Sequence, residues 1–409
     1  MLYRDQLGLE YTASSEASTL QFDRFTDKYL ASHKDAMPCL DRLNESDKEV
    51  PMAHCFRGYI LKMGGDPKFS PAIKAVLASL DLLSGAMNDR EKMHQGALKS
   101  WVDNQYSDAA DILEQLLKQY PRDILALRLV HYLHFYAGDS KEMRDSVLRS
   151  EKIWSESDPH YGYLLGMKSF GLEETGDYKE AESAGKQAVE INKTDIWAAH
   201  AVAHVFQMQG RTEDGIAWVS GLLENWKESN NFVYHLHWHK ALFHIGAGEL
   251  DKALNIYDTN LTECLTDDFY LDVCNAAALL WRLEMHGLSV DDRWQALQKF
   301  STRRVQDDEL VFSTLHYLMT PAVLKNKKLT SEAIDHFQNW SHEQTTQGDV
   351  CRQVGLPLAQ VIVELGQGKF KEATARLSSI KDDIYLIGGS HAQRHLFDDL
   401  LNHYKTLTE

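Results

Sequence analysis

The spacing of apolar residues predicts helices along most of the chain. Apolar side chains at intervals of three and four residues are typical of one face of an α-helix, and residues 276–284 and 310–319 show this spacing. Residues 106–121 read as a further helix that ends at a proline. Only 8 prolines and 24 glycines occur in 409 residues, which favours helices over strands and turns. We therefore predict an all-α fold.

A glycine followed five residues later by a small residue recurs between the predicted helices. The pairs are Gly176 with Ala181, Gly210 with Gly215, Gly248 with Ala253 and Gly368 with Ala373, and Gly138 with Met143 fits less well. Glycine permits the left-handed backbone that ends a helix, and the small residue lets the next helix pack closely. From Gly138 to Gly248 the steps are 38, 34 and 38 residues, a period typical of stacked helix–turn–helix units. The pattern is clear at residues 90–260 and 350–380 and degenerate between 265 and 345, where we still expect helices.

The repeats resemble tetratricopeptide repeats (TPRs), and strings along the whole chain are similar to those of the tetratricopeptide repeat protein 38 family. These strings are residues 5–9, 143–146, 169–175, 197–210 (WAAHAVAHVFQMQG) and 388–394 (GGSHAQR). The resemblance implies an all-helical, single-domain fold and no defined activity. We expect one TPR-like right-handed α-solenoid of about ten irregular helix pairs over residues 1–409. Residues 1–45 would form an N-terminal cap, 46–380 the repeats and 381–409 a C-terminal capping helix.

The net charge bears on the possible partners, and the cysteine pattern bears on the cellular compartment. The formal net charge is −17, whereas nucleic-acid binding needs clustered Lys and Arg, so we expect no nucleic-acid partner. No run of about 18 apolar residues predicts a membrane span. Five cysteines form no CxxC pair, and the first residues lack a basic segment followed by an apolar one. A reducing, cytoplasmic compartment is the expected location.

Two predicted helices carry histidine pairs at the same spacing, His200 with His204 and His235 with His239. An i, i+4 pair lies on one face of a helix, one turn apart. Counted back from the glycine that ends each helix, these four residues and Glu174 lie 10, 6, 13, 9 and 2 positions away. Steps of three and four relate these offsets, so they form one helical stripe. In TPR folds such positions line the concave surface, and we expect all five side chains to face one groove.

The histidine stripe leaves two functions open. In the first, His200, His204, His235 and His239 bind a peptide segment, a protein partner or a small polar or anionic metabolite. In the second, the same histidines hold a divalent metal, zinc or iron, in a hydrolase or lyase with Glu174 as oxygen ligand or base. Neither pair is HExxH, because Ala201 and Leu236 occupy the glutamate position. The sequence leaves open whether the protein is catalytic, and an open repeat edge would allow a homodimer.

Two further places could extend a ligand site. His54 and Arg57 lie one turn apart near a predicted first-helix face. Ser390 follows two glycines and is a good helix N-cap, with Arg394 one turn into the helix. Because helix N-termini attract anions, Ser390 and Arg394 are a candidate anion contact as well as a plain helix cap.

Overall fold

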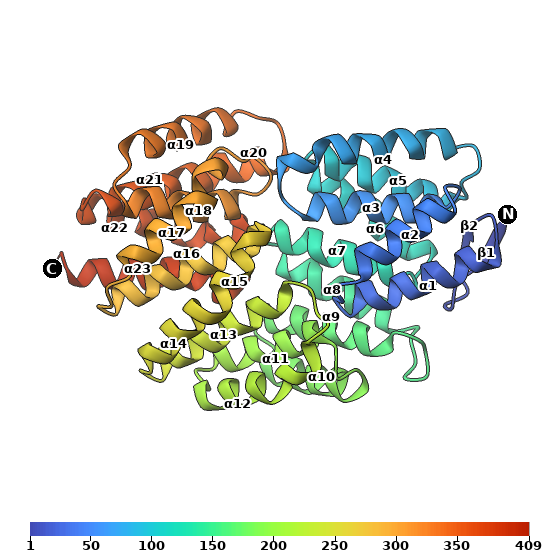
Figure 1. Cartoon of the computed structure of the whole chain (residues 1–409), viewed down its shortest axis with the longest axis horizontal. Coiled ribbons are helices and arrows are strands. Elements are labelled where there is room, and N and C mark those ends of the chain that lie inside the picture. The colour runs from blue at the N-terminus through green and yellow to red at the C-terminus, as the bar shows by residue number, and fades with distance from the viewer. Residues whose placement is uncertain (409) are drawn as a thin grey trace. The chain divides into compact units, whose positions relative to one another are not determined.

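The protein, described here by a computed structural model of residues 1–408, has the all-α, TPR-like fold that the sequence predicts (Figure 1). Helices follow one another from Glu16 to Thr406. The described strands are β1 (Leu2–Arg4) and β2 (Glu10–Thr12), which pair antiparallel in a small N-terminal hairpin. None of the helices within residues 1–408 combines the length and apolarity needed to cross a membrane.

The chain forms two compact units. Unit 1 contains Met1–Phe135, Asp139–Val205 and Ser220–Val233, and unit 2 contains Tyr136–Gly138, Phe206–Val219 and Tyr234–Glu409. The expected division into a cap, repeats and a final helix stays a prediction. Helices α7, α11, α12 and α13 have residues in both units.

Unit 1 contains α1 to α10 without Tyr136 of α7, most of α11, the end of α12 from Ser220 onward, and the short helices η1 and η2, whereas most of α12 belongs to unit 2. The helices of this region are α1 (Glu16–Leu30), α2 (Ala36–Ser46), α3 (Pro51–Met63), η1 (Pro67–Phe69), α4 (Ser70–Leu83), α5 (Asp89–Val102), α6 (Tyr106–Gln119), α7 (Ile124–Tyr136), α8 (Ser140–Glu151), α9 (Tyr161–Glu173), α10 (Tyr178–Ile191), α11 (Ile196–Met208), α12 (Thr212–Leu222) and η2 (Leu223–Trp226).

Unit 2 contains most of α13 and all the helices that follow. They are α13 (Phe232–Gly246), α14 (Leu250–Ile256), η3 (Tyr257–Leu261), α15 (Thr262–Cys264), η4 (Leu265–Asp267), α16 (Tyr270–Met285), α17 (Asp291–Ser301), η5 (Thr302–Arg304), α18 (Val311–Val323), α19 (Lys327–Trp340), α20 (Thr346–Val350), η6 (Cys351–Gly355), α21 (Leu356–Gly366), α22 (Phe370–Ile380), η7 (Lys381–Ile387) and α23 (His391–Thr406).

The turns within the helix pairs are those that the glycine pattern predicts. Gly138, Gly176, Gly210, Gly248 and Gly368 all have positive φ, between 66° and 85°. Gly287 repeats this turn between α16 and α17, with φ 86°. The degenerate region is therefore made of helix pairs too, as expected.

A small apolar cluster fixes the ends of three helices in unit 1. Leu172 of α9, Ala181 of α10 and Val205 of α11 pack together and are buried. The approach is close at Gly185 of α10, where a Cβ atom would lie 2.5 Å from Val202 Cγ2. Two polar residues, Glu173 and His204, are the direct sequence neighbours of Leu172 and Val205 in this cluster.

Candidate functional site

The ends of α9 and α11 bring buried acids and imidazoles together in unit 1. Glu173 is the last residue of α9, Glu174 follows it as the C-cap, and His204 lies on α11. Because Leu172 packs on Val205, their sequence neighbours Glu173 and His204 come into register. Glu173 and His204 are fully buried, and Glu174 is 4% exposed.

His204 faces both carboxylates through one ring nitrogen. Its Nδ1 atom lies 3.4 Å from Glu173 Oε2 and 3.9 Å from Glu174 Oε1. One ligand atom from each of the three residues lies within 4.8 Å of the others, and together they could hold a metal ion. Neutral imidazole and carboxylate are ligands that zinc and iron accept.

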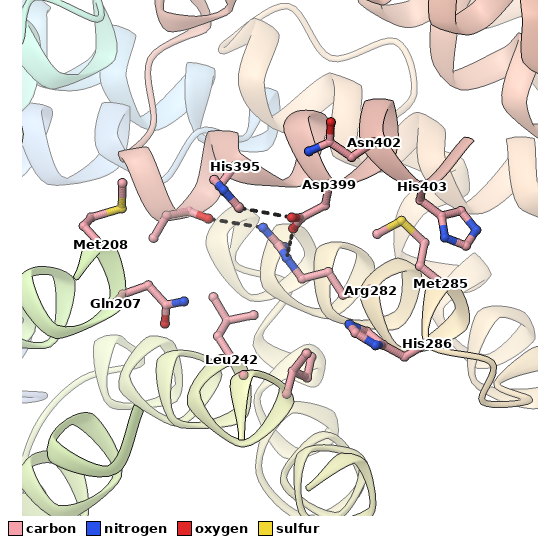
Figure 2. A pocket seen from close by; sticks show the side chains of 13 residues that line it. Gln207, Met208, Leu242, Arg282, Met285, His286, His395, Asp399, Asn402 and His403 are labelled. Carbon is pink, nitrogen blue, oxygen red and sulfur yellow. Dashed lines mark hydrogen bonds and ion pairs between the residues drawn. The ribbon is translucent and has the colours of Figure 1, made fainter. Parts of the chain in front are cut away.

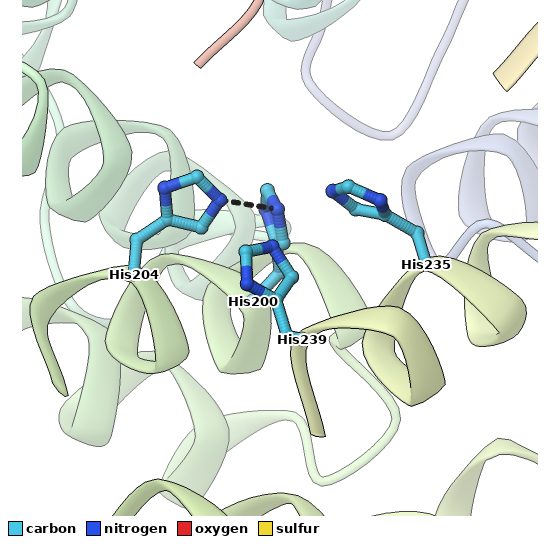
Figure 3. Close-up of side chains that lie close together, drawn as sticks. All are labelled: His200, His204, His235 and His239. Carbon is cyan, nitrogen blue, oxygen red and sulfur yellow. Dashed lines mark hydrogen bonds between the residues drawn. The ribbon is translucent and has the colours of Figure 1, made fainter. Parts of the chain in front are cut away.

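The other nitrogen of His204 contacts His200, one turn earlier on α11. The two Nε2 atoms are 2.8 Å apart (Figure 3). At this distance one ring donates and the other accepts, so one Nε2 carries hydrogen and the other carries the lone pair. The pair predicted from the i, i+4 spacing is therefore in direct contact.

Aromatic rings surround His200. Phe170 stacks on it with ring centroids 5.4 Å apart, and Phe232 meets it edge-on at 5.0 Å. Trp197 lies 5.4 Å from it and 4.9 Å from Phe170. His200 is only 3% exposed. This apolar shell restricts the freedom of the ring and excludes solvent from its contact with His204.

The second histidine pair is part of α13 in unit 2. His235 and His239 are buried, with ring centroids 4.7 Å apart (Figure 3). His235 Nδ1 lies 3.1 Å from Asn275 Oδ1, and its ring stacks on Trp238 at 5.2 Å. Burial lowers the pKa of His235 to about 4, so the ring is neutral near pH 7. That both histidine pairs line one groove stays a prediction.

The remaining candidates make their own local contacts. His54 Nε2 lies 3.0 Å from the Lys48 carbonyl oxygen, and Arg57 pairs with Asp41. Ser390 caps α23, as predicted, and accepts a hydrogen bond from the Gln393 N–H at 3.3 Å.

The anion contact proposed for the start of α23 has a competing internal partner. Arg394, one turn into the helix, donates to the Gly389 carbonyl oxygen. Ser390 and Arg394 are both buried. The capping role of Ser390 is therefore clear, whereas an anion contact stays a prediction.

Glu173 is the site residue that the sequence pattern misses. The helical stripe selects Glu174, because its offset from Gly176 fits the three-and-four spacing. Glu174 keeps a helical conformation, with φ −66°, so the stripe cannot hold both glutamates. Their side chains nevertheless bring both carboxylates to the same His204 nitrogen. Two consecutive glutamates, the second of them two positions before a turn glycine, were the available signal.

Comparison with known proteins finds only distant similarity to solved structures. No protein-family model matches the sequence. The structure of Rap protein complexed with competence and sporulation factor is 10% identical, with a TM-score of 0.41 over 88% of this chain and 98% of that one. The structure of Naa15/Naa10 bound to HypK-THB is 11% identical, with a TM-score of 0.30 over 95% of this chain and 67% of that one. Neither similarity is close enough to indicate a shared function.

Proposed function

We propose that this TPR-like protein binds a divalent transition-metal ion between α9 and α11, with Glu173, Glu174 and His204 as ligands. The distances from His204 Nδ1 to the carboxylates carry the proposal. At 3.4 and 3.9 Å they exceed the ~2.7–3.2 Å of a good N–H···O hydrogen bond. Two ligand atoms on a tetrahedral zinc ion, each at about 2.1 Å, lie about 3.4 Å apart. The 3.4 Å between His204 Nδ1 and Glu173 Oε2 therefore suits a shared ion better than a direct hydrogen bond, and Glu174 Oε1, at 3.9 Å, would move closer to complete the site.

The contact between His200 and His204 supports the same assignment. A metal-ligating histidine usually donates its second N–H to a neighbour, which fixes the ring orientation. If His204 Nε2 donates to His200 Nε2 across 2.8 Å, the lone pair of His204 Nδ1 points to the carboxylates. A lone pair facing two carboxylates is repelled unless a cation lies between them. His200 is then a positioning residue.

Burial favours an ion over a peptide at this site. Glu173, Glu174, His200 and His204 are each at most 4% exposed, so a partner segment has almost no surface of these side chains to contact. Zinc and ferrous iron both accept mixed imidazole and carboxylate ligands. Only the TPR-like fold supports a second role, in which the surface of the repeats binds protein partners.

Fewer than four protein ligands would leave a coordination position for water, which favours a second candidate function, a metal-dependent hydrolase or lyase; this function requires an opening through which a small substrate reaches the buried ion. Structural zinc sites have four protein ligands, whereas catalytic sites keep a position open. The Glu173 carboxylate lies nearer to His204 Nδ1 than the Glu174 carboxylate does. In this alternative Glu173 and His204 hold the ion and Glu174 is the general base. Glu174→Gln would then abolish hydrolysis of p-nitrophenyl acetate by zinc-loaded protein but retain the zinc.

The metal proposal is tested by elemental analysis of protein purified without a histidine tag and reloaded separately with Zn²⁺ and anaerobic Fe²⁺. We expect one ion per chain in the wild type, and its loss in Glu173→Gln and His204→Ala. His134→Ala is the matched control, because His134 forms another mostly buried His–Glu pair in unit 1, with Nε2 3.3 Å from Glu114 Oε1. Wild-type protein that retains no stoichiometric metal after reloading contradicts the proposal.

The same measurement tests the predicted role of the second pair. If the two histidine pairs face a common groove, as the repeat register predicts, the His235→Ala/His239→Ala protein retains less metal per chain than the wild type. An unchanged metal content in this variant would restrict the metal site to α9 and α11.

A further inference from the structure

Unit 2 contains a cavity of about 400 Å³ that the histidine stripe does not predict (Figure 2). Its walls come from the end of α11 and from α13, α16 and α23. Cavities that bind small molecules are typically about 300–1,000 Å³ in volume. The lining of this cavity includes apolar side chains and side chains that can donate hydrogen bonds.

Arg282 of α16 is one of the polar side chains of the lining. Its Nε donates to Asp399 Oδ2 at 3.1 Å, Nη2 to the Ala392 carbonyl at 3.2 Å and Nη1 to the Ala278 carbonyl at 3.4 Å. A guanidinium has five N–H donors in a rigid plane. Within residues 1–408 these bonds use three of them and hold the plane in place. The side chain is 6% exposed, so its charge is largely shielded from water.

The Asp399 carboxylate is shared by two cationic partners. Besides Arg282, His395 Nδ1 lies 3.1 Å from Asp399 Oδ1, and Figure 2 shows the three side chains joined in one network. The hydrogen bond to Asp399 raises the pKa of His395. Burial alone would raise the pKa of Asp399, but the His395 hydrogen bond and the charge of Arg282 hold it below its ordinary value. When His395 is protonated, the network has a net positive charge.

The rest of the lining contains both polar and apolar side chains. Asn402, His403 and His286 add hydrogen-bonding side chains near the network (Figure 2). The apolar part is formed by Met208, Leu242, Ile245 and Met285. An anion in the cavity would accept a charge-assisted hydrogen bond from the rigidly held Arg282 guanidinium. An apolar chain attached to this anion would cover the methionine, leucine and isoleucine side chains.

We propose that this cavity binds a small amphipathic anion, a carboxylate or phosphate group on a short apolar chain. The anionic group contacts the Arg282 guanidinium, and the apolar chain packs on Leu242 and Ile245. This site is independent of the proposed metal centre, because no residue is common to the two.

The headgroup requirement is tested by isothermal titration calorimetry with four probes that share one eight-carbon chain. We expect octanoate or octyl phosphate to bind, and octanol and octylamine to bind more than about tenfold more weakly, since a hydrogen bond to a charged group contributes ~1.5–3 kcal/mol. The stronger of the two anions identifies the headgroup as carboxylate or phosphate. Octanol binding as tightly as both anions, or no binding of either anion at millimolar concentration, overturns the proposal.

Two variants place the binding in the cavity by different means. Arg282→Met removes the charge, and Ile245→Trp fills the apolar part; each should weaken anion binding more than about tenfold. Arg293→Met and Ile191→Trp are the matched controls, because Arg293 pairs with Asp258 on the surface and Ile191 is 50% exposed. If circular dichroism shows that Arg282→Met is unfolded, Ile245→Trp decides. Unchanged affinity in a folded Ile245→Trp protein overturns the proposal.

Discussion

His204 Nε2 lies 2.8 Å from His200 Nε2, one turn away on α11, while His204 Nδ1 faces Glu173 and Glu174. The two nitrogens of one ring thus have opposite surroundings, an imidazole on one side and two carboxylates on the other. Which of the two rings donates in this contact decides the tautomer of His204, and the tautomer decides whether Nδ1 can ligate a cation.

His200 should therefore affect metal affinity without being a ligand. We expect His200→Ala to weaken zinc binding about 10–100-fold, the usual effect of removing such an orienting partner, whereas His204→Ala loses the site. His200→Gln offers an amide oxygen as acceptor and should recover part of the affinity. Competition with a chromophoric chelator measures all three. A His200→Ala loss as large as that of His204→Ala would make His200 a ligand instead.

The glycine pattern predicts the fold well because it reports on local backbone conformation. Gly176, Gly210 and Gly248 all have the positive φ that the pattern requires, and the histidine spacing places His200 next to His204. The helical spacing of residues does not predict which side chains make contact at the end of a helix, and the sequence pattern therefore misses Glu173. The Arg282–Asp399 pair joins residues 117 positions apart, and no local pattern indicates that separation.

Asp195, which precedes α11, should make stability fall as pH rises. The carboxyl is buried and accepts a hydrogen bond from the Ala198 N–H at 3.0 Å. Burial raises its pKa to about 7, against an ordinary value near ~3.9 in the unfolded chain. Between these values the folded state binds the extra proton, so this contribution is complete below about pH 4 and is lost as pH rises through 7.

Asp195→Asn tests this dependence, because the amide imitates the protonated carboxyl. We expect the variant and the wild type to have similar melting temperatures at pH 5, and the variant to be the more stable protein at pH 8. Differential scanning calorimetry across this range measures the difference directly. A variant that is less stable at pH 8 would mean that ionised Asp195 is stabilised by the nearby Arg128 charge more than burial destabilises it.

Asp123 should have the opposite pH dependence in the same unit. It is buried with Arg90, whose Nε lies 2.6 Å from Asp123 Oδ2, and with His94, whose Nε2 lies 3.2 Å from the same oxygen. Burial would raise the pKa of Asp123, but the Arg90 charge and the His94 hydrogen bond hold it far below its ordinary value. Its contribution is therefore present above about pH 4 and is lost as pH falls below that.

Asp123→Asn leaves the Arg90 charge buried without its counter-ion and should cost about 3–5 kcal/mol in urea unfolding at pH 7. Asp139→Asn is the control, because Asp139 caps α8 from an exposed position and asparagine caps equally well. The free energies of unfolding of the two variants should differ by most of that cost at pH 7 and by less at pH 3. Equal stabilities at pH 7 would show that the buried network contributes little net free energy.

Substitutions at Gly215 and Gly221, both on α12, distinguish the effect of close helix packing on stability from the effect of helix propensity. A Cβ atom at Gly215 would lie 2.3–2.5 Å from three carbons of the buried Phe243 ring, whereas one at Gly221 would meet nothing within 4 Å. Gly215→Ala should therefore destabilise the protein by about 1–3 kcal/mol, as overpacking does. Gly221→Ala should stabilise it by up to about 1 kcal/mol, because alanine favours the helix. Urea unfolding of both variants measures the two signs in one helix. If Gly215→Ala is also stabilising, the small residue five positions after Gly210 is not required for the approach of α13 to α12, and the packing explanation of the repeat pattern fails at this unit.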